Sequence, residues 1–254
     1  MARAIMGGMV KTGVPGAEIA VINPNNPASM EQVRELCGAV PSGAEALESA
    51  EVIVLAVKPQ TFPDALPIYK PHIPQAALVV SIMAGIDIAS LEAGFPGQRI
   101  VRVMPNLNLS VGKGASGYAA GKYATRADCA QVNAIFSAAG VAVEVPERLI
   151  DDVAALSGSG SAYLYLMTEA LRDVAIEDGV PGETAELLAR QTLIGAAKLL
   201  EDTGEPPEEL RRRITSKKGT TEAAINAMLD MKLPEAVKAG YRANKRRSAE
   251  LAKL

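Results

Sequence analysis

The segment AEVIVLAVKP (residues 50–59) decides the fold, because its uninterrupted run of apolar side chains, VIVLAV, leaves no polar face. Side chains of a strand alternate between the two faces of a sheet, so such a run belongs to a strand buried on both faces. The same pattern returns in AALVVSIMAG (76–85) and QRIVRVMPN (98–106), with the helical pattern DIASLEAG between these two runs. Apolar strands joined by helices predict a parallel sheet that is covered by helices on both faces.

The segments before and after these three strands continue the alternation of strands and helices. They are the strand AEIAVIN (17–23), the helix ASMEQVRELCGA (28–39), the segment GASGYAAG (114–121), the helix RADCAQVNAIFSAAG (126–140) and the strand VAVEVP (141–146). After about Arg148 the patterns are all helical, with glycine or proline at the breaks. We therefore predict an α/β fold: a doubly wound, mostly parallel, Rossmann-like sheet in residues 1–148, followed by an all-helical domain in residues 149–254.

Composition excludes several classes of function. The 26 basic and 29 acidic residues nearly balance, which removes a general electrostatic argument for binding nucleic acid or an anionic membrane. The most apolar run, AALVVSIMAGI (76–86), is too short to span a bilayer. Cys37 and Cys129 lie outside any CxxC motif, so we predict a cytoplasmic protein without a zinc site. His72 is the only histidine, which argues against a catalytic triad and a multi-histidine metal site.

Three segments indicate where a ligand binds. In a doubly wound sheet the ligand lies beyond the carboxyl ends of the strands. AVKPQ (56–60), SIMAG (81–85) and RVMPN (102–106) each follow a predicted strand with residues that favour tight turns and allow close approach to the backbone. Each alone is ordinary loop sequence, but their recurrence at three successive strand ends predicts a binding edge.

The residues after the strand AEIAVIN bear on the choice of cofactor. NAD-binding folds usually have an acidic residue there to receive the ribose hydroxyls, whereas NPNN (23–26) offers amides and no carboxylate. The missing negative charge leaves room for a 2′-phosphate, which favours NADP(H) over NAD(H). The alternative is a proline turn that only caps the next helix.

Two glycine-containing segments open helices in the second half, LSGSGSAYLY (156–165) and TSKKGTTEAAI (215–225). The backbone amides around Gly219, Thr220 and Thr221 could hold a carboxylate, because the N–H groups at a helix start are unpaired. Equally, Thr220 or Thr221 could merely cap the helix, with Glu222 in its first turn.

The helix ETAELLARQTLIGAAKLLED (183–202) is apolar around most of its circumference. Such a helix needs packing partners on several sides, more than a small helical domain supplies alone. We therefore predict a dimer interface formed by the C-terminal helices.

Together these segments resemble the pyrroline-5-carboxylate reductase family, whose members form proline by reducing a cyclic imine with NAD(P)H. The resemblance extends from MARAIMGG (1–8) to RRSAEL (246–251), and its most specific parts are LSGSGSAY and GTTEAAI. It implies a nucleotide-binding domain followed by helices that interlock with those of a second subunit, so that the substrate site is shared. A homodimer is expected, and a higher oligomer of dimers is left open.

The resemblance also implies a reaction and a set of site residues. Hydride passes from NADPH, with NADH as the alternative, to the imine carbon of a substrate whose carboxylate lies where a helix begins near Gly219. The substrate site is expected to consist of Ser216, Gly219, Thr220 and Thr221, with Ser216 and Thr221 as the catalytic candidates and Thr221 hydrogen-bonded to the ring nitrogen. The cofactor is expected to lie against Asn23, Ala56, Val57, Lys58, Pro59, Ala84, Gly85 and Asn106.

The sequence departs from the family pattern at three places. The usual Ser-Pro-Gly-Gly-Thr-Thr has Lys217 and Lys218 in place of proline and glycine, so Lys218 is strained if the turn requires a positive φ there. Ser161 replaces the proline after Ser-Gly-Ser-Gly. The helical pattern MARAIMGGMV (1–10) lacks the preceding family strand and most of its Gly-x-Gly turn, and a natural extension of about 8 to 12 residues is expected to supply them.

Two other functions remain open. The Lys217–Lys218 pair fits a related NADP-dependent reductase that acts on another cyclic imine or small carboxylate. The missing strand fits a catalytically silent homologue that acts only in oligomerisation.

Overall fold

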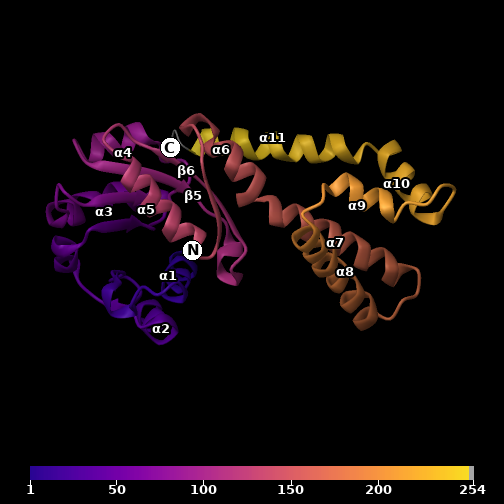
Figure 1. The fold of residues 1–254 in the computed structure, drawn as a ribbon, viewed down its shortest axis with the longest axis horizontal. Helices are drawn as coiled ribbons and strands as arrows, with labels where there is room; N and C mark the ends of the chain where they lie inside the picture. The colour runs from indigo at the N-terminus through magenta and orange to yellow at the C-terminus, as the bar shows by residue number, and fades with distance from the viewer. Residues whose placement is uncertain (252–254) are drawn as a thin grey trace. The chain divides into compact units, whose positions relative to one another are not determined.

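The computed structural model describes residues 1–251, and helices alternate with strands in its first part (Figure 1). The elements of that part are α1 (Ala2–Lys11), β1 (Ala20–Val21), α2 (Pro27–Cys37), β2 (Val40–Pro41), β3 (Val52–Leu55), α3 (Phe62–Tyr69), β4 (Leu78–Ser81), α4 (Ile88–Gly94), β5 (Arg99–Met104), β6 (Gly114–Ala120), α5 (Arg126–Ser137) and β7 (Gly140–Glu144). Each predicted strand and helix is present, with ends that differ by a few residues.

The chain from residue 150 to 251 is helical, as predicted. Its helices are α6 (Ile150–Val153), α7 (Gly160–Glu177), α8 (Gly182–Thr203), α9 (Pro207–Arg213), α10 (Thr220–Asp230) and α11 (Leu233–Leu251). A single turn of π-helix, η7 (Ala154–Gly158), lies between α6 and α7.

In the part of the chain that the structure describes, the main sheet has five strands in the order β3-β4-β5-β6-β7. Strands β3, β4 and β5 run parallel, β6 is antiparallel to β5, and β7 is parallel to β6. The prediction of a mostly parallel sheet is therefore confirmed.

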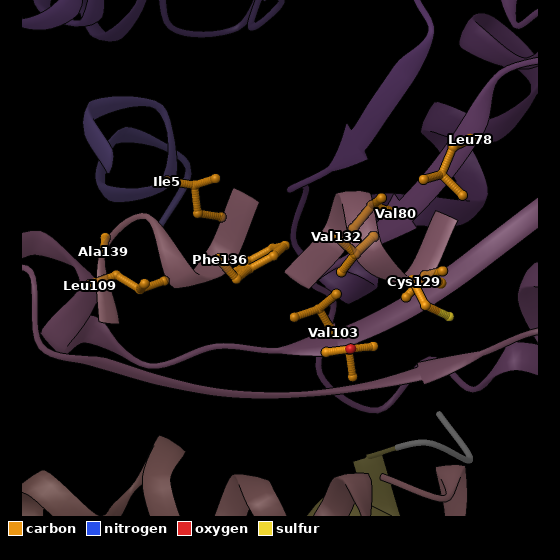
Figure 2. Close-up of a cluster of buried hydrophobic side chains, with 11 residues drawn as sticks. Ile5, Leu78, Val80, Val103, Leu109, Cys129, Val132, Phe136 and Ala139 are labelled. Carbon is orange, nitrogen blue, oxygen red and sulfur yellow. The ribbon is translucent and has the colours of Figure 1, made fainter. Parts of the chain in front are cut away.

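Both faces of this sheet are covered by helices. Leu78 and Val80 of β4 belong to a core formed with α1 and α5, whereas Val79 packs with residues of α3 and α4 on the opposite face. All three side chains are fully buried, as their apolar run predicted. Figure 2 shows the first of these cores, in which Ile5 of α1 and Phe136 of α5 lie over the sheet. The doubly wound arrangement is confirmed.

Strands β1 and β2 form a separate two-stranded parallel sheet. The predicted strand at residues 17–23 is therefore shorter than expected and does not belong to the main sheet. Among residues 1–251 no strand pairs with the outer edge of β1 or of β3.

The chain forms two compact units. One contains Met1–Ser159 together with the chain from Asn244 onward, and the other contains Gly160–Ala243. The first unit thus includes α6, the π-helical turn and the end of α11. The domain boundary after Arg148 stays a prediction.

Within residues 1–251 we find no helix that is both long and apolar enough to cross a membrane.

Candidate active site

The carboxyl ends of three parallel strands meet at one edge of the main sheet. Leu55 is paired with Ser81 in the β3–β4 ladder, and Ser81 is paired with Arg102 in the β4–β5 ladder. Because the strands run in the same direction, the segments 56–59, 82–85 and 105–106 leave the sheet at this same edge. The structure therefore brings together the cofactor residues predicted from three separate segments.

These residues differ in exposure. Ala56, Val57, Lys58 and Ala84 are exposed, Pro59 is half-buried, and Gly85 and Asn106 are buried. Gly85 has a φ of 78°, a conformation that glycine adopts without strain. In this turn Ala84 is exposed and the next residue, Gly85, is buried. A flat ligand could therefore lie against the backbone here.

The side chain of Asn106 is hydrogen-bonded to two separate backbone segments. Its Nδ2 donates to the carbonyl oxygen of Ser157 over 3.1 Å, and its Oδ1 accepts from the backbone N–H of Ala115 over 3.0 Å. The side chain thus ties the end of β5 to the start of β6 and to the π-helical turn. Its predicted cofactor contact stays a prediction.

Helix α1 lies beside this edge. It contacts η5 (Leu107–Val111), the turn that follows the carboxyl end of β5. It also approaches the end of α5 closely, since a Cβ added to Gly8 would lie only 2.8 Å from the Cβ of Ala139. The first turn of α1 has neither an acidic residue nor a side-chain cap, so its N–H groups suit an anionic group such as a phosphate.

The segment after β1 carries no negative charge. Asn23 is exposed, and its backbone N–H contacts the Sδ of Met30 at 3.1 Å. Asn26 caps α2 by accepting from the N–H of Ser29 over 3.0 Å, and the first turn of α2 contains no acidic residue. Together with the turn at Gly85, these residues fit an NADP-type cofactor, because no carboxylate here opposes a 2′-phosphate.

Asp87, two residues after Gly85, caps helix α4. Its carboxylate accepts a hydrogen bond from the backbone N–H of Ser90 over 2.8 Å. Hydrogen bonding to Ser90 lowers the pKa of Asp87, so the group is charged at neutral pH. We assign Asp87 to helix capping.

The predicted substrate residues lie in the other compact unit, around a tight turn. The N–H of Gly219 donates to the carbonyl oxygen of Ser216 over 2.9 Å, and Lys218 has a φ of 61°. A positive φ at the third residue is typical of a type II turn, which prefers proline at the second position and glycine at the third. The condition under which Lys218 is strained, a positive φ, is therefore met.

The start of α10 has no side-chain cap. Gly219 is the N-cap residue, and neither threonine hydroxyl bonds to the backbone of the first turn. The alternative in which Thr220 or Thr221 caps the helix is therefore wrong. A Cβ on Gly219 would collide with the Oγ of Ser216, so the Ser216 hydroxyl lies directly against the helix start. The N–H groups of the first turn, the Ser216 hydroxyl and the half-buried Thr221 are the groups here that can bind a small carboxylate. Glu222 stands in the same turn, and its carboxylate accepts a hydrogen bond from the backbone N–H of Lys218 over 2.7 Å.

Replacing Lys218 by glycine is expected to stabilise the protein by about 1 kcal/mol, because the turn then no longer holds a side chain at positive φ. Thermal unfolding at a fixed protein concentration measures the gain. Lys217→Gly is the matched control: φ at position 217 is not positive, so added backbone freedom should lower stability. An equal gain from both variants would contradict the assignment of strain to position 218.

Sequence reasoning missed a buried charge in β5. Arg102 is only 5% exposed and forms ion pairs with Glu147 at 3.4 Å and Asp151 at 3.5 Å. A signal was present, because an arginine within the apolar run QRIVRVMPN needs acidic partners if that strand is buried. Sequence alone could not say which of the many carboxylates these partners are.

Comparison with known proteins identifies the chain. A model for pyrroline-5-carboxylate reductase dimerisation matches residues 147–251, and a model for coenzyme F420-dependent NADP oxidoreductases matches residues 1–85. The pyrroline-5-carboxylate reductase of Pseudomonas aeruginosa is 40% identical over 99% of this chain and 93% of its own length. That of Methanosarcina acetivorans is 40% identical over 90% of this chain and 86% of its own.

A solved structure has closely the same fold as this chain. The pyrroline-5-carboxylate reductase of Coxiella burnetii has a TM-score of 0.91 and 34% identity, over 98% of this chain and 94% of that one. The fold and the matched models define an NAD(P)-dependent oxidoreductase with a helical dimerisation region. The chain belongs to the pyrroline-5-carboxylate reductase family.

Proposed function

We propose that this protein reduces 1-pyrroline-5-carboxylate to L-proline with NAD(P)H, the last step of proline biosynthesis. The observation that carries the proposal is the 40% identity to a named pyrroline-5-carboxylate reductase along almost the entire chain. That match covers both the binding edge of the sheet and the turn before α10.

The reaction adds a hydride to the imine carbon and a proton to the imine nitrogen. The nicotinamide cofactor supplies the hydride when it is bound. Thr221 hydrogen-bonds the ring nitrogen, and the N–H groups at the start of α10 hold the substrate carboxylate beside Ser216. A protonated imine is already electrophilic, so positioning is the main task of these side chains.

The cofactor edge supports a preference for NADPH over NADH. Residues 23–26 present amides, and the first turn of α2 has no carboxylate that would repel a 2′-phosphate. The structure of the Plasmodium falciparum relative, 26% identical with a TM-score of 0.84 over 99% of this chain and 94% of that one, contains NADP. We expect a lower KM for NADPH than for NADH.

The expected assembly is a homodimer formed through the C-terminal helices, and a higher oligomer of such dimers is compatible with it. The family model for dimerisation, which covers α6 to α11, supports self-association. Cytoplasmic localisation is consistent with Cys37 and Cys129, which are both free thiols.

An NADPH oxidation assay with pyrroline-5-carboxylate tests the proposal. We expect turnover with this substrate and much weaker turnover with its six-membered homologue. A preference for the homologue would favour a reductase of another cyclic imine. No turnover with either imine, in a protein that still self-associates, would favour a silent homologue.

A further inference from the structure

Two cations in the turn before α10 are left without a partner. The side chains of Lys217 and Lys218 are exposed, and in the part of the chain that the structure describes neither ammonium group forms a hydrogen bond or an ion pair. Arg212 and Arg213, at the end of α9, each pair with a glutamate instead. The turn therefore carries two positive charges that no neighbouring side chain neutralises.

A carboxylate stands at the same helix start. Glu222 lies in the first turn of α10, and its carboxylate accepts a hydrogen bond from the backbone N–H of Lys218 over 2.7 Å. This bond holds the negative charge beside Gly219, the N-cap residue. Alone, Glu222 would oppose any anion that approaches the helix start. The lysine pair reverses this effect, because two positive charges outweigh one negative charge.

The turn itself does not require lysine at either position. Lys218 has a φ of 61°, which glycine adopts without strain, and the second position of a type II turn favours proline. Lysine at both positions therefore adds charge without helping the turn to form. A side chain retained in a strained conformation is typical of functional segments.

We propose that Lys217 and Lys218 select substrates that carry a carboxylate, by attracting the anion to the start of α10. They act through their charge and are not catalytic residues. The inference rests on the proposed function and adds two specificity residues to it. The lysine pair responds to the charge of the substrate and not to the size of its ring.

The spacing along the chain suits this role. Consecutive Cα atoms are about 3.8 Å apart, so the backbones of both lysines lie within about 8 Å of the N-cap residue Gly219. The Debye length is also about 8 Å at physiological ionic strength, so the two charges are only partly screened at the helix start. In water, one unit charge at about 8 Å changes the binding of an anion about twofold, and two such charges change it about fivefold.

The test compares the full-length wild type with Lys217→Gln/Lys218→Gln at low ionic strength and saturating NADPH. Glutamine keeps a side chain at both positions, so the strain at position 218 is unchanged. We expect kcat/KM for pyrroline-5-carboxylate to fall about fivefold. The kcat should be unchanged, since the attraction acts on binding and not on hydride transfer. At about 1 M salt the Debye length is about 3 Å, so both proteins should then have the same kcat/KM.

A substrate without the carboxylate separates attraction from general damage. The cyclic imine 1-pyrroline has the same ring and the same reacting bond but no carboxylate, so its kcat/KM should not fall in the double variant. Lys217→Arg/Lys218→Arg keeps both charges and should retain the wild-type kcat/KM with pyrroline-5-carboxylate.

Lys232→Gln is the matched control. Lys232 is also an exposed lysine with a positive φ, 58°, but it follows the far end of α10. This helix has 11 residues and is therefore about 16 Å long, roughly two Debye lengths. The control should leave kcat/KM for pyrroline-5-carboxylate unchanged.

A wild type without turnover would overturn both the proposed function and this inference. An active wild type whose kcat/KM at low ionic strength equals that of the glutamine double variant would overturn the inference alone. So would an equal loss with 1-pyrroline, or a loss that persists at high salt, since neither can arise from attraction of a carboxylate.

Discussion

Replacing Thr221 by alanine is expected to lower kcat/KM for pyrroline-5-carboxylate about 100-fold, the usual scale for loss of a hydrogen-bonding or proton-transferring side chain at the reacting atoms. Thr221 is half-buried in the first turn of α10, and its hydroxyl does not cap that helix. The hydroxyl is therefore free to bind the ring nitrogen. The Kd for NADPH should be unaffected, which fluorescence titration can verify.

Thr221→Ser keeps the hydroxyl and should restore most of the activity. Thr203→Ala is the matched control, because Thr203 is an exposed helical threonine whose hydroxyl bonds only to nearby backbone: it donates to the carbonyl oxygen of Leu199 and accepts from the N–H of Glu205. Activity of Thr221→Ala equal to that of the control would remove Thr221 from the proposed site.

The second large effect is expected from Leu187→Asp combined with Leu188→Asp on α8. Within residues 160–243, all of which the structure describes, Ala185 is the only buried side chain. Many large apolar side chains of this unit are instead exposed, including Leu164, Leu166, Leu187, Leu188, Ile194 and Leu199. A unit with so little core needs a partner, and the family model for dimerisation supports a second copy of the chain.

Two carboxylates buried in that interface would be desolvated without partners, which costs several kcal/mol. We expect the double variant to be monomeric in size-exclusion chromatography with light scattering, and to lose at least about 100-fold in activity, a factor that corresponds to 2.7 kcal/mol.

Leu36→Asp is the control for this prediction. Leu36 on α2 is 64% exposed, as is Leu187, but it lies in the unit that contains the sheet. The control should remain dimeric and active. A dimeric double variant would show that this face of α8 does not form the interface.

Much of the fold could be predicted from the sequence, because strands that are buried on both faces consist of runs of apolar residues. Apolar runs marked β3, β4 and β5, the last of them interrupted by Arg102, and all three strands are present with helices on both faces of their sheet. Strand β1 was harder to predict. Its apolar run resembles the others, yet among residues 1–251 it pairs with β2 alone, since the pairing of a strand depends on its neighbours in space.

The candidate site was predictable in part. Segments 56–59, 82–85 and 105–106 could be placed at one edge because parallel strands share a direction. The sequence left open whether φ at Lys218 is positive, and the structure shows that it is. The role of the Asn106 side chain could not be predicted from the sequence. Its two partners, Ser157 and Ala115, are backbone groups, which carry no sequence signal.

The sequence by itself determined the strand order along the chain, the helical second half and the segments that form the binding edge, because periodicity and turn chemistry are local properties. Only the tertiary structure decided which carboxylates neutralise Arg102 and that Asn244 bonds to Ser159, 85 residues away. Such pairs depend on where distant segments meet, and many other acidic and hydroxyl side chains of this chain could have satisfied the same chemistry.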